Sequence, residues 1–164
     1  MSKSDTPLDE IDTKRSRKRL KDPTFHNDRP IHAFDTETSE GDVFMLSVAP
    51  HNTDPYTIPK EQFDAHGNLT RLSTDTILNE LTKRKFSNGV SVWYNLKFDA
   101  DVIFAGLPEK NLKELKIENQ TEYNDYEISY LPGKSLRIRR NKQTYEHFDI
   151  SQILPGGLET VAQD

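Results

Sequence analysis

The chain has 164 residues, a formal net charge of −5 at pH 7 and no cysteine, so disulfide bonds and thiolate metal sites are excluded. Its length suits one domain with a sizeable core, and no apolar run approaches the roughly 18 residues of a membrane-spanning helix. The polar N-terminus also lacks a secretory signal, so we expect a cytoplasmic protein with no membrane partner.

The first 29 residues read as a disordered, charged tail. They lack periodic apolar residues and include a basic run at residues 14–21 (KRSRKRLK), a composition that cannot bury enough surface to order itself. Residues 1–30 carry a net charge of +2, whereas the rest of the chain carries −7. The basic run could contact nucleic-acid phosphates, and the alternative is a solvated tail with no specific partner. We expect residues 30–164 to form the folded domain.

From residue 31 onward the pattern is that of an α/β domain. Runs rich in β-branched and aromatic residues predict strands, and apolar residues spaced by three and four predict helices. The predicted strands cover residues 31–35, 43–49, 56–58, 90–94, 126–130, 135–139 and 145–150. Predicted helices cover residues 72–81 and 98–105, and two more begin at Pro108 and Leu158. We expect a twisted mixed β-sheet flanked by helices on both sides.

Two acidic clusters follow predicted strands. Asp35 is the last residue of the predicted strand at residues 31–35, and Glu37 follows it closely. Asp99 ends the segment that follows the predicted strand at residues 90–94. In a strand, positions i and i+2 point to the same face, so Asp35 and Glu37 can reach one metal ion together. Carboxylates at the ends of neighbouring strands can converge on Mg²⁺ or Mn²⁺. A metal pair held in this way can cleave a phosphodiester bond.

Taken singly, these residues have simpler structural interpretations. A solvated surface pair accounts for Asp35 and Glu37, and a helix-capping role accounts for Asp99, since an anion at a helix N-terminus gains roughly 0.3–1 kcal/mol. Asn95 would be a turn residue, and Phe98 would belong to the core. The combination of both clusters at strand ends favours the metal-site interpretation.

Both clusters also resemble known motifs. Residues 34–38 (FDTET) resemble the first exonuclease motif of family B DNA polymerases, and residues 93–99 (WYNLKFD) resemble the second. The second is especially similar to the form in protein-primed polymerases of phages and archaeal viruses. Residues 130–135 (YLPGKS) and 147–152 (HFDISQ) follow in the family's order. The resemblance covers roughly residues 31–164 and leaves the tail unexplained.

The resemblance implies a ribonuclease-H-like fold of the DEDD class. Its activity would be 3′–5′ removal of nucleotides from the 3′ end of single-stranded DNA, with two Mg²⁺ or Mn²⁺ ions. Asp35 would bridge the two ions, Glu37 would bind one of them and orient the attacking water, and Asp99 would hold the other. These three residues are therefore the expected catalytic residues and metal ligands.

The resemblance also implies residues that bind the DNA. Thr38 and Asn95 match positions that contact the 3′-terminal nucleotide in relatives. Phe98 matches an aromatic residue near the frayed end, where stacking suits single strands of any sequence.

One family feature is missing from the sequence. Relatives carry a third motif, Tyr-x-x-x-Asp, a few tens of residues beyond the segment that matches Phe148 and Asp149. This sequence ends at Asp164, before that position, and it lacks the polymerase palm and fingers. We therefore expect an incomplete metal site and weak or no activity from this chain alone. A polymerase fragment that supplies the missing C-terminal part is a further expected partner.

Other functions remain open. The chain could be a catalytically silent module that binds single-stranded nucleic acid, a split-polymerase subunit or a gene remnant, or another ribonuclease-H-like nuclease. A phosphate-binding loop ending at Gly133 is excluded because Ile128 stands where a second glycine is needed. His147 does not indicate the histidine variant of the DEDD class, because Gln152 occupies the position of its aspartate.

Overall fold

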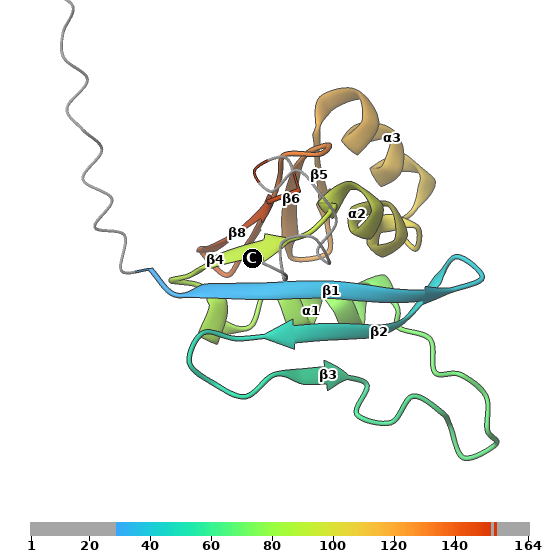
Figure 1. Ribbon diagram of the computed structural model, residues 1–164. Helices are drawn as coiled ribbons and strands as arrows, with labels where there is room; N and C mark the ends of the chain where they lie inside the picture. Colours follow the sequence, from blue (N-terminus) through green and yellow to red (C-terminus); the bar gives the residue numbers. More distant parts are fainter. Residues whose placement is uncertain (1–28, 152, 154–164) are drawn as a thin grey trace, which may run out of the picture.

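The structure is a computed structural model that describes residues 29–151 and 153 (Figure 1). The expected tail and the expected helix at Leu158 lie outside these residues, except for Arg29. The strands are β1 (Ile31–Ser39), β2 (Asp42–Ala49), β3 (Tyr56–Ile58), β4 (Val90–Trp93), β5 (Gln120–Tyr123), β6 (Tyr126–Leu131), β7 (Ser135–Arg140) and β8 (Gln143–Asp149). The helices are α1 (Thr74–Leu81), the short 3-10 helix η1 (Arg84–Phe86), α2 (Leu96–Phe104) and α3 (Glu109–Glu118). No helix among the described residues is long and apolar enough to cross a membrane.

The strands form one mixed sheet in the order β3-β2-β1-β4-β8-β7-β6-β5. Its centre is parallel, because β4 pairs in parallel with both β1 and β8, while the other pairs are antiparallel. The β1–β4 pairing ends at Phe34 and Trp93, and the β4–β8 pairing ends at Trp93 and Asp149. The carboxyl ends of the three central strands therefore meet at one edge of the sheet, and β1 continues beyond β4 to Ser39.

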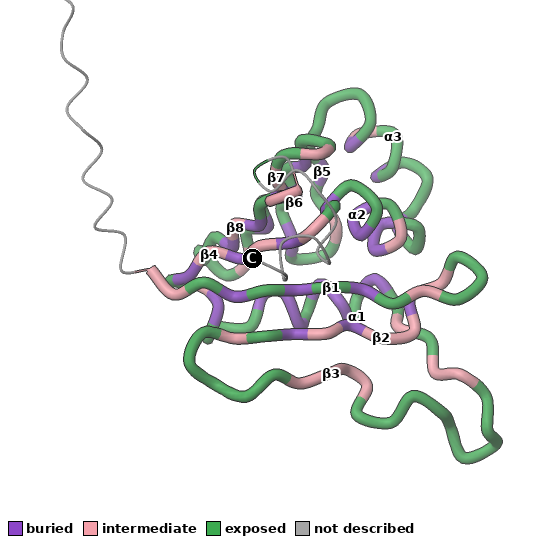
Figure 2. The backbone as a smooth tube through the Cα atoms, viewed as in Figure 1, coloured by how far each residue is buried: buried purple, intermediate pink, exposed green. Residues whose placement is uncertain are grey.

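One face of the sheet forms the core. Buried and exposed residues alternate along β1, β6 and β7, with His32, Phe34 and Thr36 buried on β1 (Figure 2). The helices pack on this same face: Phe86 of η1 contacts Phe34 edge-on, and Phe104 of α2 contacts Tyr130 of β6. This period-two alternation is typical of a sheet with one buried face.

The α/β class and the mixed sheet flanked by helices are confirmed, but the expected helices on both sides are not seen. Within the described residues, α1, α2 and α3 all contact the face that carries His32 and Phe34. On the second face, alternate positions of β1, β6 and β7 carry polar or exposed residues. These strands therefore offer no continuous apolar surface on which a helix could pack.

An aromatic cluster joins the three central strands. Phe34 stacks on Trp93 with ring centroids 5.3 Å apart, and the Trp93 Nε1–H donates a 3.0 Å hydrogen bond to Nδ1 of His147. His147 is fully buried, and this desolvation lowers its pKa to about 3. His147 is therefore neutral at ordinary pH and accepts the indole hydrogen bond. The cluster thus aligns the three central strands close to the edge of the sheet at which the acidic residues lie.

Candidate functional site

Asp35 and Glu37 lie on the extension of β1 beyond β4. Both are exposed, and both face away from the helices, since the intervening Thr36 is buried. Asp35 pairs with Ser47 and Glu37 pairs with Met45 of β2. The prediction that the two carboxylates share one face of a strand is confirmed.

Asp99 reaches the same segment of β1 from the first turn of α2. Its Oδ1 accepts hydrogen bonds from the backbone N–H of Thr36 at 3.1 Å and from Thr36 Oγ1 at 2.6 Å. The chain leaves β4 after Trp93 and turns at Asn95, which has a left-handed conformation with φ 65° and ψ 49° that asparagine tolerates. Because no strand continues beyond Trp93, Asp99 takes the N–H that a longer β4 would have paired.

The three carboxylates influence one another electrostatically. Desolvation raises the pKa of Asp99 to about 6. The charge of Asp35 also raises this pKa, whereas the hydrogen bonds from Thr36 lower it. Partial burial, followed by the charge of Glu37, also raises the pKa of Asp35. The folded protein therefore binds a proton at Asp99 more tightly than the unfolded chain does. Its stability falls as pH rises from the unfolded pKa near 4 towards about 6.

The donor set fits a hard divalent cation, although the described side chains are not arranged around one. No group of three or more His, Asp or Glu side chains in residues 29–151 and 153 is positioned to hold a metal ion. Carboxylate oxygens are nevertheless the ligands that Mg²⁺ and Mn²⁺ prefer, and a cation would relieve the carboxylate repulsion that adds to desolvation in raising the pKa of Asp35 and Asp99. The side chains of Asp35 and Glu37 are exposed on the segment of β1 whose Thr36 backbone Asp99 contacts.

The residues expected to bind DNA lie at two places. Asn95 is exposed at the N-terminus of α2, where its carbonyl accepts a 3.0 Å hydrogen bond from the Phe98 N–H. Phe98 is 49% exposed despite its size. Both residues come shortly before Asp99 in the sequence, and the exposure of Phe98 shows that it is not the core residue of the simpler interpretation. Thr38 lies further along β1, just beyond a bulge that follows Glu37, and is half-buried.

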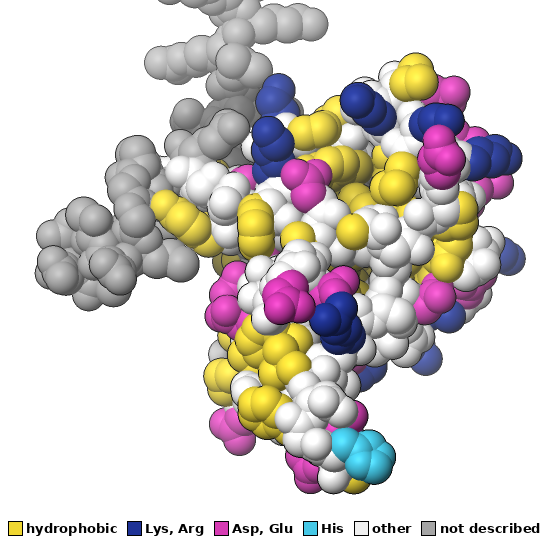
Figure 3. Space-filling model, turned by 90° about the vertical axis from the view of Figure 1, so that its right-hand side faces the viewer, with side chains coloured by type: hydrophobic (Ala, Val, Ile, Leu, Met, Phe, Trp, Pro, Cys, Tyr) yellow, Lys and Arg dark blue, Asp and Glu magenta, His cyan; other side chains and the backbone are white. Residues whose placement is uncertain are grey.

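The surface around the end of β1 combines acidic and hydrophobic groups. Figure 3 views the molecule from the right-hand side of Figure 1 and shows acidic side chains with hydrophobic groups above and below them. On the open face of the sheet, Asp35 also lines a groove of about 470 Å³ whose other walls include Ala33, Ala49, Val92 and Tyr94. Sequence reasoning missed this groove, although small residues at outward positions of neighbouring strands were a signal for it.

Asp149 is the other acidic residue at this sheet edge. Tyr145 and Asp149 have the spacing of the third family motif, but they lie on a strand, and sequence reasoning overlooked this spacing. Oδ1 of Asp149 accepts hydrogen bonds from the backbone N–H and the hydroxyl of Ser151, at 2.8 and 2.6 Å. Asp149 thus closes the turn after β8. Desolvation raises the pKa of Tyr130 on β6, and the charges of Asp101 and Asp149 add to this effect.

Comparisons with protein-family models, with curated proteins and with solved structures find no match. The function of the chain is therefore inferred from the chemistry of its own residues.

Proposed function

We propose that this chain carries a two-metal site of the 3′–5′ exonuclease type, which hydrolyses phosphodiester bonds at the 3′ end of single-stranded DNA. The observation that carries the proposal is the pair of hydrogen bonds from Thr36 to Asp99. They fasten a carboxylate of α2 beside the strand segment that presents Asp35 and Glu37. Bound Mg²⁺ or Mn²⁺ would supply an activated water and stabilise the leaving oxygen.

The roles of the three carboxylates follow from their positions. Asp35 would be a ligand of both ions, as the resemblance implies; the charge of Glu37 acts on Asp35, and the charge of Asp35 acts on Asp99. Glu37 is exposed on β1 and would orient the water, while Asp99 would hold the second ion from the helix side. Because the pKa of Asp99 is about 6, its ligand form predominates above that pH. Below pH 6 a proton therefore competes with the cation for Asp99, and we expect more Mn²⁺ to be needed for the same activity.

The substrate contacts lie at the N-terminus of α2. The exposed ring of Phe98 would stack on a base of the frayed end, and the Asn95 amide would bond to the terminal nucleotide. Thr38 would contact the same nucleotide from β1. A fourth carboxylate would come from a partner such as a polymerase fragment, and a site with Asp35, Glu37 and Asp99 alone would cleave slowly.

A second candidate is a catalytically silent module that binds single-stranded nucleic acid. It is favoured by the absence of a preformed group of metal-binding side chains among the described residues. The two candidates differ in whether cleavage requires Asp35.

The test is digestion of a 5′-labelled single-stranded DNA with Mn²⁺ at pH 8. We expect slow shortening from the 3′ end, removal of this activity by EDTA, and a loss of at least about 100-fold in Asp35→Asn, since a preorganised electrostatic group contributes roughly that much. Asp101→Asn, an exposed substitution on α2, is the matched control and should cleave like the wild type. Equal cleavage by wild type and Asp35→Asn, or none by either, would favour the silent module.

A further inference from the structure

Among residues 29–151 and 153, no helix covers the second face of the sheet at its parallel centre. Parallel strands are ordinarily covered on both faces, yet no described helix covers this side of β4 and β8. Large hydrophobic side chains are left in solvent there: Ile31 is 57% exposed, Phe148 is 38% exposed and Leu131 is 49% exposed. Exposed aromatic and aliphatic groups on an ordered surface indicate an interaction site.

Phe148 lies at the centre of this face. It pairs with Val92 of β4 on one side and with Ser135 of β7 on the other, and Arg137 pairs with Glu146 one step along the same face. A phenyl ring on a sheet, with hydroxyl and guanidinium groups beside it, suits a nucleic-acid base and its phosphate.

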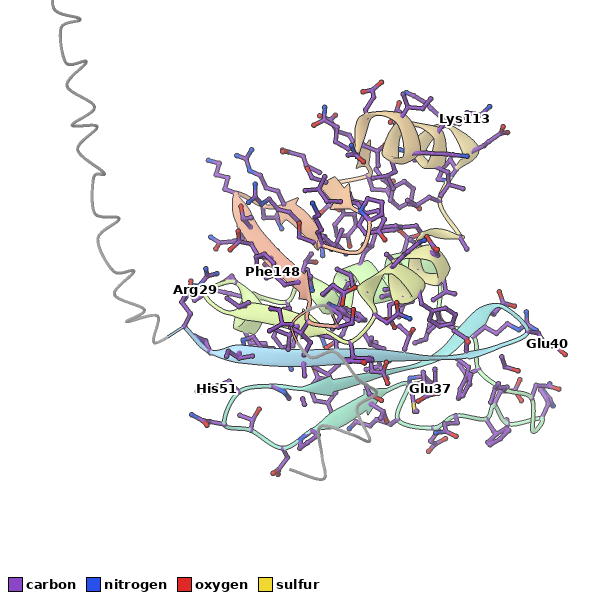
Figure 4. All side chains as sticks on the ribbon, turned by 45° about the horizontal axis from the view of Figure 1, so that its top comes forward. Arg29, Glu37, Glu40, His51, Lys113 and Phe148 are labelled. Atoms are coloured by element: carbon purple, nitrogen blue, oxygen red, sulfur yellow. The ribbon has the colours of Figure 1, made fainter. Side chains whose placement is uncertain are left out.

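The same face is locally positive on a chain whose net charge is −5. Arg29 and Arg137 share the single carboxylate of Glu146, at 3.2 and 3.3 Å, and Arg139 pairs with Glu127 at 3.3 Å. The Arg137 and Arg139 side chains are 63% and 54% exposed. Exposed ion pairs are worth under about 1 kcal/mol, so phosphates can replace these carboxylates at little cost. Figure 4 shows Arg29 and Phe148 on the same side of the molecule.

The face is continuous with the carboxylate site. Ala33 of β1 pairs with Val92, which pairs with Phe148, and Asp35 is the next outward residue after Ala33. Three neighbouring strands at about 4.8 Å place Phe148 roughly 10 Å from β1. Two or three nucleotides cover that distance, since stacked nucleotides rise about 3.4 Å each. Val92, the strand neighbour of Phe148, lines the same groove as Asp35.

We propose that this open face is a platform for single-stranded nucleic acid, with Phe148 stacking on a base and Arg137 and Arg139 holding phosphates. One part of this proposal rests on the proposed function: the bound strand would run along the platform towards Asp35. Binding on the platform requires neither a metal ion nor cleavage, and it can therefore be measured apart from the nuclease reaction.

The test is the fluorescence anisotropy of a labelled oligothymidine with the full chain in EDTA, over 50–200 mM salt. We expect Phe148→Ala to weaken binding roughly 5- to 100-fold, because each stacked base is worth about 1–3 kcal/mol. The double variant of Arg137→Ala and Arg139→Ala should make the salt dependence shallower by about 1.4 in log–log slope, or 0.7 for each phosphate contact.

Matched controls come from α3, which lies apart from this face (Figure 4). Ile117→Ala removes a side chain that is 77% exposed, and Lys110→Ala with Lys113→Ala removes two cations from surface ion pairs. Both controls should bind like the wild type. An effect of Phe148→Ala no larger than that of Ile117→Ala would overturn the platform.

Two further results separate the platform from the nuclease proposal. Weaker oligonucleotide binding by Phe148→Ala would support the platform even if no Mn²⁺-dependent cleavage occurred. A wild-type dimer in sedimentation that Phe148→Ala converts to a monomer, with unchanged DNA binding, would contradict the platform. The face would then be an interface between copies of the chain.

Discussion

Asp99→Asn should stabilise the metal-free protein at pH 8 by roughly 1–3 kcal/mol and abolish its stabilisation by Mn²⁺. The pKa of Asp99 is raised to about 6, so ionisation of this buried carboxylate opposes folding above that pH, and one pKa unit corresponds to about 1.4 kcal/mol. Asparagine keeps an oxygen that accepts the hydrogen bonds from Thr36 but carries no charge. A residue whose charge destabilises the fold is typical of a functional site.

Thermal unfolding with and without Mn²⁺ measures both effects. At 100 times its dissociation constant, a ligand that binds only the folded state adds about 2.7 kcal/mol, so the wild type should gain about that amount. Asp99→Asn and Asp35→Ala should gain little, whereas Asp101→Asn should respond like the wild type. An equal response to Mn²⁺ in all four proteins would place the binding elsewhere on the chain.

His147→Gln should make the protein more resistant to acid. The pKa of His147 is about 3 in the folded protein and near 6.5 in the unfolded chain, so the unfolded chain binds more protons over this range. Stability is therefore lost as pH falls from about 6.5 towards 3, at about 1.4 kcal/mol per pH unit and up to roughly 5 kcal/mol in total. Glutamine can accept the hydrogen bond from Trp93 and does not titrate.

Urea unfolding at pH 7, 5.5 and 4.5 tests this expectation. Between about pH 4 and 6, the titration of Asp99 raises the free energy of unfolding as pH falls, whereas that of His147 lowers it. The informative quantity is therefore the difference in the free energy of unfolding between variant and wild type at each pH. That difference should grow in favour of His147→Gln as pH falls. His66→Gln, at an exposed loop position, is the control. A constant difference across the three pH values would show that His147 is already protonated in the folded protein or remains unprotonated in the unfolded chain.

Much of the sheet follows from local sequence pattern, and the exceptions have physical causes. The β6–β7 hairpin and the β4 strand were predicted from their β-formers. The strand β5 was missed because Gln120–Tyr123 is polar, and it forms by pairing with β6 while α3 covers it through the Asn111–Thr121 hydrogen bond. The predicted first strand ended at residue 35, whereas β1 continues to Ser39 because β2 pairs with it along its whole acidic segment.

The candidate site was predicted in part. The positions of Asp35, Glu37 and Asp99 near the ends of two predicted strands indicated that the three residues are neighbours. In the structure, the hydrogen bonds from Thr36 hold Asp99 beside β1. The bare face around Phe148 could not be predicted, because it depends on the parallel register between Val92 and Phe148, which are far apart in the sequence. Local pattern gives the side of a strand on which a residue lies, but not which strand becomes its neighbour.

The most direct test of the metal site is the carboxyl pKa of Asp99, followed by carbon NMR in the absence and presence of saturating Mg²⁺. Without the cation the pKa should be about 6. With Mg²⁺ beside Asp35, Glu37 and Asp99, the charged form is favoured and the pKa should fall below about 4. An Asp99 pKa that Mg²⁺ leaves unchanged would contradict the assignment of these three residues as metal ligands.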